Sequence, residues 1–360
     1  MKHVIFRLLA MALTMLVLGG CVPVQKTVWE DNVFRYQNPI TQGIMGGIRD
    51  AQIFEDNGKY YLIGTAPPFW EGESPGVRLY MSDNLLDWTF IGLLIDRDLL
   101  DPSVWYYDRF WAPEIAKING KYYLLVNCRN ELGSKQHPHG CCVAVADEIT
   151  GPYTVLTHEA PFHGGNDLTF FEDDDGKVYA YWNGAKRMYA AEVDMAAMKP
   201  ILPQGGDEPL IVFTPTPGTW DSIGIEGPYV IKHEDVYYMF YSSWSRGYEI
   251  GYATAINPLG PWTKFPGNPI YGAQSKGACK KNNLPYSGDP DNPFRAVGHN
   301  EIWEGPDGRL WISCHGIVKG EEPYLVIDPI EFDDDGVIHV EGPTYTPQEI
   351  KLRGKFLGLF

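Results

Sequence analysis

Short apolar strands alternate with polar turns along most of the chain, and one such unit recurs five times. In each unit an apolar strand runs into a tight polar turn, and an aromatic-rich strand follows directly. The turns and the strands after them occupy residues 57–62, 119–124, 175–180, 234–239 and 307–312, so their starts lie 62, 56, 59 and 73 residues apart. A turn signal between two apolar runs predicts a β-hairpin. The pattern therefore predicts antiparallel hairpins at near-even spacing.

A third strand follows most hairpins, as at residues 77–81, 142–146 and 249–254, and a turn with an aromatic side chain comes next. Three to four antiparallel strands repeated at this period are typical of a β-propeller. We therefore predict an all-β, five-bladed β-propeller that fills residues 36–345 as a single domain. Residues 346–360 would close or flank the last blade. An irregular β-sandwich with chance similarity is the alternative, and five hits at near-even spacing count against it.

The first residues have the pattern of an export signal. Lys2, His3 and Arg7 precede an apolar run of 11 residues, 8–18, which is too short to span a bilayer comfortably. Residues 18–21, Leu-Gly-Gly-Cys, resemble a bacterial lipoprotein box. The resemblance implies a signal peptide over 1–20, lipidation of Cys21, a tether over 21–35 and anchoring of the exported protein to the bacterial envelope. An ordinary secretory signal is the alternative.

The composition of the chain limits the classes of partner that it is expected to bind. Asp and Glu number 46 against 29 Lys and Arg, a net charge of −17, which argues against nucleic acid and against an anionic membrane surface. The membrane would be reached only through the N-terminal lipid. Five cysteines remain after Cys21, and their spacing matches no zinc pattern. We expect buried thiols, with one disulfide as the alternative; the five are Cys128, Cys141, Cys142, Cys279 and Cys314.

The repeat also predicts where the chemistry lies. The first strand of each propeller blade lines the central channel, so the residues that open these strands meet at one mouth of it. At these places the sequence has four acids and one imidazole: Asp50, Glu114, Asp167, Glu226 and His299. Crowded carboxyls raise one another's pKa values, and glycoside hydrolysis needs one protonated carboxyl and one ionised carboxylate. The alternative is that these acids cap strand ends or bind a cation.

These stretches, taken in order, resemble glycoside hydrolase family 43, five-bladed propeller enzymes that cleave arabinose- and xylose-containing glycans. The matching stretches are residues 49–50, 111–114, 167–176, 226–228 and 298–300. The resemblance implies that Asp50 is the general base, that Glu226 is the general acid, and that Asp167 orients the acid and tunes its pKa. It also implies inversion at the anomeric carbon, with Asp50 activating a water.

The resemblance extends to a metal and a pocket. His299 matches a channel histidine that helps to hold a hydrated calcium in many members, and a hydrogen-bonded histidine without metal is the alternative. Two residues depart from the family's motifs: Ala51 replaces the usual Pro of the base motif, and Glu114 replaces a common Asp. Both lie beside the expected glycan pocket, so they affect the expected substrate more than the catalytic assignment. No organic cofactor is expected.

Aromatic side chains stack on the C–H faces of sugars. We expect one or two of the tryptophans near the channel, together with Glu114, to contact the glycan; these are Trp70, Trp105, Trp111, Trp182 and Trp244. The polar stretch 265–297, inserted between the fourth and fifth repeats, would wall one end of the pocket and favour exo cleavage.

Three functions remain open from the sequence. The first is an inverting, exo-acting glycosidase on arabinose- or xylose-type glycans. The second is a same-fold glycosidase on galactofuranoside, galactan or anhydro-galactose glycans. The third is a non-catalytic glycan-binding propeller, against which the set of Asp50, Asp167 and Glu226 argues.

Overall fold

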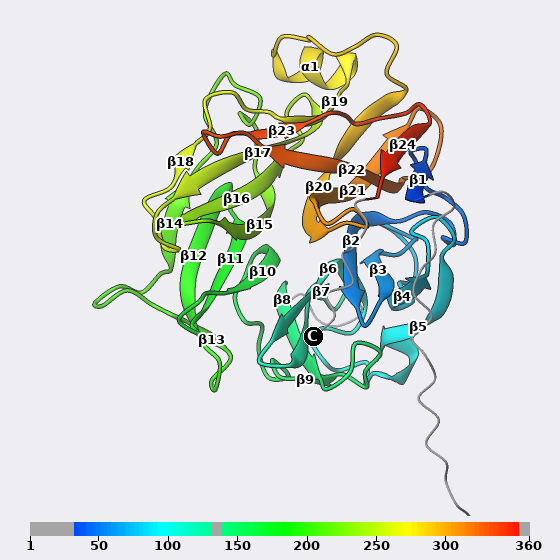
Figure 1. Cartoon of the computed structure of the whole chain (residues 1–360). Coiled ribbons are helices and arrows are strands. Elements are labelled where there is room, and N and C mark those ends of the chain that lie inside the picture. The colour runs from blue at the N-terminus through cyan, green and yellow to red at the C-terminus, as the bar shows by residue number, and fades with distance from the viewer. Residues whose placement is uncertain (1–31, 132–138, 353–360) are drawn as a thin grey trace, which may run out of the picture.

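The computed structural model describes residues 32–131 and 139–352, and its strands form five sheets of four or five antiparallel strands and one separate pair. The predicted signal peptide 1–20, Cys21 and most of the predicted tether lie outside the described residues. The five sheets follow one another along the chain as blades (Figure 1).

The strands of each blade are consecutive in sequence. Blade 1 contains β2 (Arg49–Asp56), β3 (Lys59–Thr65), β4 (Gly76–Ser82) and β5 (Thr89–Asp96); blade 2 contains β6 (Arg109–Ile118), β7 (Lys121–Arg129), β8 (Gly140–Ala146) and β9 (Thr154–Val155). Blade 3 contains β10 (Asn166–Glu172), β11 (Val178–Gly184), β12 (Arg187–Asp194), β13 (Lys199–Ile201) and β14 (Leu210–Phe213). Blade 4 contains β15 (Glu226–His233), β16 (Val236–Ser243), β17 (Gly247–Ala255), β18 (Thr263–Lys264) and β19 (Tyr271–Gln274); blade 5 contains β20 (Phe294–Glu304), β21 (Leu310–Val318), β22 (Tyr324–Phe332) and β23 (Ile338–Val340).

The first strands of the blades form a closed ring. Each contacts the next in the order β2, β6, β10, β15, β20, and β20 contacts β2 again. This arrangement confirms the predicted five-bladed, all-β propeller. A short helix, α1 (Lys276–Asn282), lies between blades 4 and 5, and a 3-10 turn (Arg97–Leu99) follows blade 1.

The two ends of the described chain meet beside blade 5. Strand β1 (Val33–Tyr36) pairs with β24 (Gln348–Lys351) as a separate two-stranded sheet. Tyr36 donates to Asp328 Oδ1 at 2.9 Å, and the Asn38 amide exchanges hydrogen bonds with the backbone of Ile327. The first strand therefore fastens both ends of the chain to the last blade.

Tight turns explain why the same short sequence motif recurs. The turn residues Asn57 and Gly58 both have positive φ, at 52° and 77°, and Asn119 and Gly120 repeat this at 50° and 76°. Two-residue hairpin turns of this conformation match the right-handed twist of strands and favour Asn-Gly. The turn chemistry thus fixes the register of the first hairpin in these blades.

The core is divided among the interfaces between blades. Each of the five clusters of buried apolar side chains joins two neighbouring blades, such as Ile63 with Leu124, or Phe240 with Ile312. The cluster between blades 5 and 1 also contains Phe34 and Tyr36 of β1. All five cysteines after Cys21 are buried free thiols.

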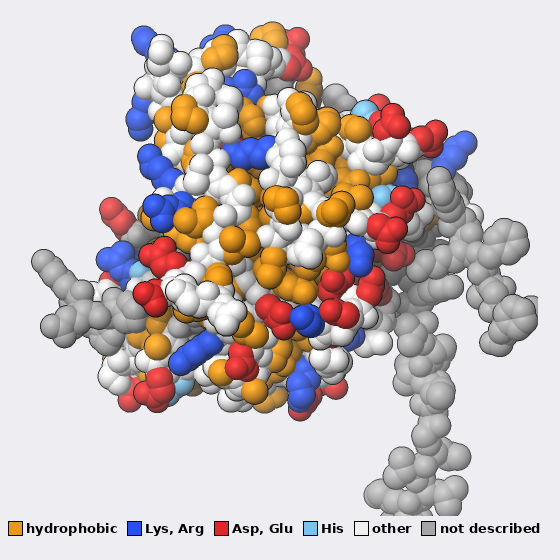
Figure 2. All heavy atoms as spheres, turned by 90° about the vertical axis from the view of Figure 1, so that its left-hand side faces the viewer, with side chains coloured by type: hydrophobic (Ala, Val, Ile, Leu, Met, Phe, Trp, Pro, Cys, Tyr) orange, Lys and Arg blue, Asp and Glu red, His pale blue; other side chains and the backbone are white. Residues whose placement is uncertain are grey.

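The outer edge is less regular. Figure 2, which faces the side of β14 and β18, shows apolar side chains interspersed with charged ones. Ile201, Leu202, Leu210 and Ile211 are about two-fifths to one-half exposed there. Within the described ranges, no helix combines the length and the apolar character that a bilayer crossing requires.

Candidate active site

Each inner strand has a bulge at the same end, and this feature forms the channel mouth. The pairing register shifts between Arg49 and Gln52 in blade 1, and the same shift recurs in blades 2 to 5. The bulged residues have positive φ in all five blades: Asp50 at 52°, Ala112 at 42°, Asp167 at 58°, Gly227 at 59° and His299 at 60°. An extra residue in one strand bends it and re-aims its side chains, and such bulges are frequent beside active sites.

The bulges correct the predicted equivalence of the five residues. Asp50, Asp167 and His299 occupy the bulge itself, whereas Glu226 precedes the bulged Gly227 and Glu114 lies two residues after the bulged Ala112. Asp50, Asp167, Glu226 and His299 line one cavity at the mouth, and Glu114 does not line it. Three carboxylates therefore converge at the mouth, not four.

This cavity has a volume of about 220 Å³ and draws residues from all five blades. The residues that line it are Arg49, Asp50, Trp70, Trp111, Ala112, Asn127, His139, Asn166, Asp167, Glu226 and His299. We call it the mouth cavity.

Asp50 is held as a carboxylate. Thr65 Oγ1 donates to its Oδ2 at 2.6 Å, and His299 Nδ1 lies 3.3 Å from its Oδ1. Burial by itself raises the pKa of Asp50, but the charges of His299 and Arg49 and the Thr65 hydrogen bond outweigh it and hold the pKa at about 2. His315, whose burial lowers its pKa well below the usual value, is neutral and accepts the Asp50 backbone N–H at 3.0 Å.

Asp167 connects blades 2, 3 and 4. Its Oδ1 accepts from Asn127 Nδ2 at 2.7 Å, and its Oδ2 accepts from the backbone N–H of Gly227 at 3.1 Å. Burial and then the Asp50 charge raise the pKa of Asp167. The Gly227 bond fixes the bulge that carries Glu226. Glycine fits there because the His299 ring lies against it, and a Cβ would come within 3.3 Å of that ring.

Glu226 has the opposite electrostatic setting to Asp50. Burial, and next the Asp167 charge, raise the pKa of Glu226 to about 7. His299 and a hydrogen bond from Tyr248 to Glu226 Oε1 oppose the rise. Two carboxyls whose environments push their pKa values apart are suited to a base and an acid respectively.

His299 lies among these carboxylates. Burial lowers the pKa of His299, but the charges of Asp50, Asp167 and Glu226 outweigh burial and raise it. Its Nδ1 lies 3.3 Å from Asp50 Oδ1. Among the described residues, no group of three or more His, Cys, Asp or Glu side chains is placed to hold a metal ion. A hydrated calcium beside His299 would keep water molecules as ligands, so it stays a prediction, and calcium enters no step below.

Glu114 lies beyond the bulge of β6 and outside the mouth cavity. It accepts from Thr169 Oγ1 at 2.7 Å. Burial raises the pKa of Glu114 to about 8 and that of Glu301 well above its usual value. Glu114 does not line the mouth cavity, so the structure gives no support to its predicted contact with glycan.

The five predicted tryptophans have different surroundings. Trp105 is buried in the core between blades 1 and 2 and donates to Thr157 O at 2.9 Å, which corrects the prediction for it. Trp70 is 66% exposed at the mouth cavity, with the Arg49 guanidinium 5.2 Å from its ring centroid, and Trp111 lines the cavity while donating to Phe69 O at 2.8 Å. Trp182 has no exposed surface and stacks on Tyr189 within the core, so it presents no face to a sugar, which corrects the prediction. Trp244 is 40% exposed but does not line the cavity.

The insertion 265–297 does not wall the mouth cavity, contrary to the prediction. Asn282 of α1 donates to Ser245 O at 2.7 Å, and the Ser275 N–H donates to Arg246 O at 2.7 Å. The insertion therefore packs on the turn between β16 and β17, and none of its residues lines the mouth cavity.

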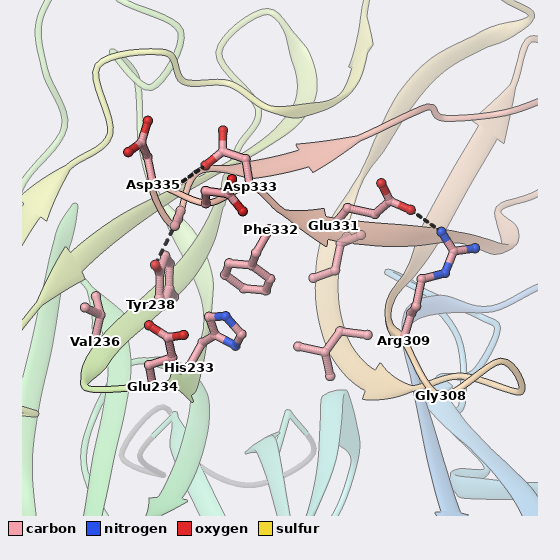
Figure 3. Close-up of a pocket in the computed structure, with 14 residues that line it drawn as sticks. His233, Glu234, Val236, Tyr238, Gly308, Arg309, Glu331, Phe332, Asp333 and Asp335 are labelled. Carbon is pink, nitrogen blue, oxygen red and sulfur yellow. Dashed lines mark hydrogen bonds and ion pairs between the residues drawn. The ribbon is translucent and has the colours of Figure 1, made fainter. Parts of the chain in front are cut away.

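A larger cavity, of about 820 Å³, lies between blades 4 and 5. Strand β15 begins at Glu226 and ends at His233, which lines this cavity, so the cavity opens at the other end of the blade. Figure 3 shows His233 and Phe332 within it, surrounded by acidic side chains such as Asp333 and Asp335. The rings of His233 and Phe332 stack on each other with centroids 4.0 Å apart. The residues that line this larger cavity include no carboxyl with a raised pKa opposite one with a lowered pKa, as Glu226 and Asp50 are in the mouth cavity.

Sequence reasoning missed Thr65, Asn127, Tyr248 and His315, which hold the three carboxylates. They lie on second or third strands of the blades, outside the repeated motif, and no local pattern marks them.

Comparison with known proteins identifies relatives of this chain. The chain is 24% identical over 329 residues to a non-reducing end alpha-L-arabinofuranosidase of Bacteroides ovatus, which covers 86% of this chain and 55% of that protein. It is 28% identical over 358 residues to the extracellular endo-alpha-(1->5)-L-arabinanase 2 of Bacillus subtilis, covering 83% of this chain and 71% of that one. The chain spans about half the length of several of the curated relatives that it matches.

Among solved structures, a thermostable family-43 glycoside hydrolase superimposes with a TM-score of 0.70 at 30% identity, over 88% of this chain and 99% of that one. The model of glycosyl hydrolases family 43 matches residues 36–338, which span all five blades. The chain therefore belongs to glycosyl hydrolase family 43.

Proposed function

We propose that this protein is an inverting glycosidase that removes single arabinose- or xylose-type residues from the non-reducing ends of glycans. The observation that carries the proposal is that Asp50 and Glu226, on blades 1 and 4, line one cavity with opposite protonation preferences. The names of the relatives, arabinofuranosidase, arabinanase and xylosidase, support the substrate class.

In the proposed reaction, Asp50 takes a proton from a water as that water attacks the anomeric carbon. Glu226, protonated below pH about 7, gives its proton to the departing glycosidic oxygen. Asp167 keeps the acid protonated through its charge and fixes the bulge that carries it through the Gly227 N–H. Inverting pairs stand about 6.5–9.5 Å apart so that the water fits between them.

The size of the mouth cavity supports exo action. Its volume of about 220 Å³ is below the range of about 300–1,000 Å³ for pockets that take drug-sized ligands, and it suits one sugar ring. Trp70 would provide the stacking face. The likeness to an endo-arabinanase favours a second candidate, endo cleavage of arabinan, which releases oligosaccharides first.

The test is a product assay on arabinose, xylose and galactose glycans, with Asp50→Ala and Glu226→Ala as matched variants. The proposal expects monosaccharide as the first product, inverted anomeric configuration in NMR of that product, and loss of turnover in both variants with unchanged folding. Oligosaccharides as first products favour endo action, and release of galactose moves the substrate class to the galactose glycans. Binding without hydrolysis of any glycan contradicts enzymatic function.

We further propose export and lipid anchoring through Cys21, supported by the sequence pattern at residues 18–21. Mass spectrometry of the N-terminal peptide, with and without Cys21→Ser, tests it. A chain without lipid at Cys21 would contradict the proposal.

A further inference from the structure

Tyr248 is a buried residue that the family motifs do not contain, and its hydroxyl donates a hydrogen bond to Glu226 Oε1. It is the second residue of β17, and only 4% of it is exposed. Its ring lies against Gly298, where a Cβ would come within 2.4 Å of it, and its centroid is 5.4 Å from that of His315. The packing of the ring therefore fixes the position of the hydroxyl.

The contact constrains which oxygen of Glu226 carries the proton. A phenol has one hydrogen to donate, and Tyr248 donates it to Oε1. If Glu226 is protonated while it accepts this bond, its own proton lies on the other oxygen, Oε2. A free carboxyl would divide the proton between both oxygens and between several rotamers.

The same hydroxyl connects the acid side of the site to the base side. It lies 3.5 Å from His299 Nδ1, and that nitrogen lies 3.3 Å from Asp50 Oδ1. Tyr248 thus occupies a fixed place in a row of polar atoms that begins at Glu226 and ends at Asp50. A residue that served only to fill space would not need a hydroxyl at this place.

We propose that Tyr248 is a positioning residue that occupies Glu226 Oε1, so that Glu226 presents its proton on Oε2 to the departing oxygen. The inference rests on the proposed function. As the glycosidic C–O bond breaks, its electron pair goes to the departing oxygen, which takes the proton from Oε2. Tyr248 keeps its own proton and stabilises the carboxylate that forms, since hydrogen bonds to charged acceptors are the stronger ones.

The dependence on the leaving group distinguishes this role from a structural one. A leaving group that departs readily as an anion needs no protonation, whereas an alkoxide needs it. Tyr248→Phe keeps the ring and its packing and removes only the hydroxyl. Tyr252→Phe is the matched control, because Tyr252 is four residues further along the same strand and is also buried. Its hydroxyl accepts from the Ile338 N–H at 3.5 Å, and the residue does not line the mouth cavity.

The experiment measures kcat on 2,4-dinitrophenyl α-L-arabinofuranoside and on α-1,5-arabinobiose, or on the xyloside pair if the wild type prefers xylose. General acid catalysis contributes about 10²–10⁴-fold, so we expect Tyr248→Phe to lose about 10–100-fold on the disaccharide. On the dinitrophenyl glycoside the loss should be only about twofold, and Tyr252→Phe should match the wild type on both.

Equal losses of Tyr248→Phe on the two substrates, or no loss on either, would overturn the inference while the proposed function stands. Glu226→Ala serves as the reference for a missing acid. A wild type that cleaves neither substrate pair overturns the proposed function and this inference together.

Discussion

Asp167→Asn should move the alkaline limb of the activity profile to lower pH. The substitution removes one negative charge from beside Glu226 while it retains the shape of the side chain. Burial is the largest cause of the raised pKa of Glu226, and the Asp167 charge is the next. Without that charge the protonated form of Glu226 loses part of its advantage, so the acid gives up its proton at lower pH.

The size of the effect follows from the pKa of Glu226, which stands at about 7 against an ordinary 4.5. Because burial remains, we expect the limb to fall by about one pH unit, less than half of the whole rise, which corresponds to about 1.4 kcal/mol. At pH 7 the protonated fraction of Glu226 then drops from about one-half to about one-tenth, a fivefold loss, whereas at pH 5 it stays above about nine-tenths. If Asp167→Asn also disturbs the orientation of Glu226, the maximum activity falls, but the pH of the alkaline limb does not change.

The assay is kcat/KM against pH from 4 to 9 at constant ionic strength. Asp173→Asn is the control, because it removes the same charge from the far end of the same blade, about 20 Å along the strand, where Asp173 contacts Lys232 and Tyr237. A limb that stays in place or rises in Asp167→Asn, or one that moves equally in the control, would refute the reasoning.

The remaining predictions concern the pocket wall, the core and the channel. Trp70→Ala should raise KM about fivefold, about 1 kcal/mol of lost stacking, with an unchanged melting temperature; an unchanged KM contradicts a platform there. Trp182→Ala should instead lower the free energy of unfolding by about 3–5 kcal/mol in denaturant titration, because this ring is fully buried, and a loss below about 1 kcal/mol would count against a core role. Glu114 binds its proton more tightly in the folded than in the unfolded chain, so its stabilising effect is complete below pH about 4.5 and is lost as pH rises through about 8. The melting temperature of Glu114→Gln should therefore fall less steeply over this range than that of the wild type, and parallel curves in scanning calorimetry would contradict this.

The fold was predictable because its signals are local. Each hairpin needs a turn that only a few residue types adopt readily, and Asn57-Gly58 and Asn119-Gly120 supply it within two positions. Five tight turns at near-even spacing, two of them Asn-Gly, determine the number of blades, and alternating apolar positions determine which faces pack between them. The position of the helix α1 was not predictable in the same way, since its seven residues lie in a polar insertion without a clear helical period.

Asp50, Asp167, Glu226 and the nearby His299 were identifiable because they open the inner strands, and the radial layout of a propeller brings such positions to one mouth. The position of each residue relative to the bulge of its strand was not predictable. A bulge adds one residue to a strand and reverses which side chains face the channel, so Glu226 lies one residue before its bulge and Glu114 two residues after its own. No residue type or spacing in the sequence indicates where that extra residue lies.

The amino-acid sequence by itself determined the repeat, the propeller and the acids at its mouth, because each depends on neighbours within about ten residues. Only the tertiary structure decided which acid is protonated, which tryptophan is exposed and which side chain holds Glu226. These depend on burial and on charges brought from other blades, as with Asp167 beside Glu226, and on third strands such as β17, which places Tyr248 against the acid. Interactions between residues 20 to 60 positions apart leave no local pattern, because they arise only when the strands of one blade pair and neighbouring blades pack together.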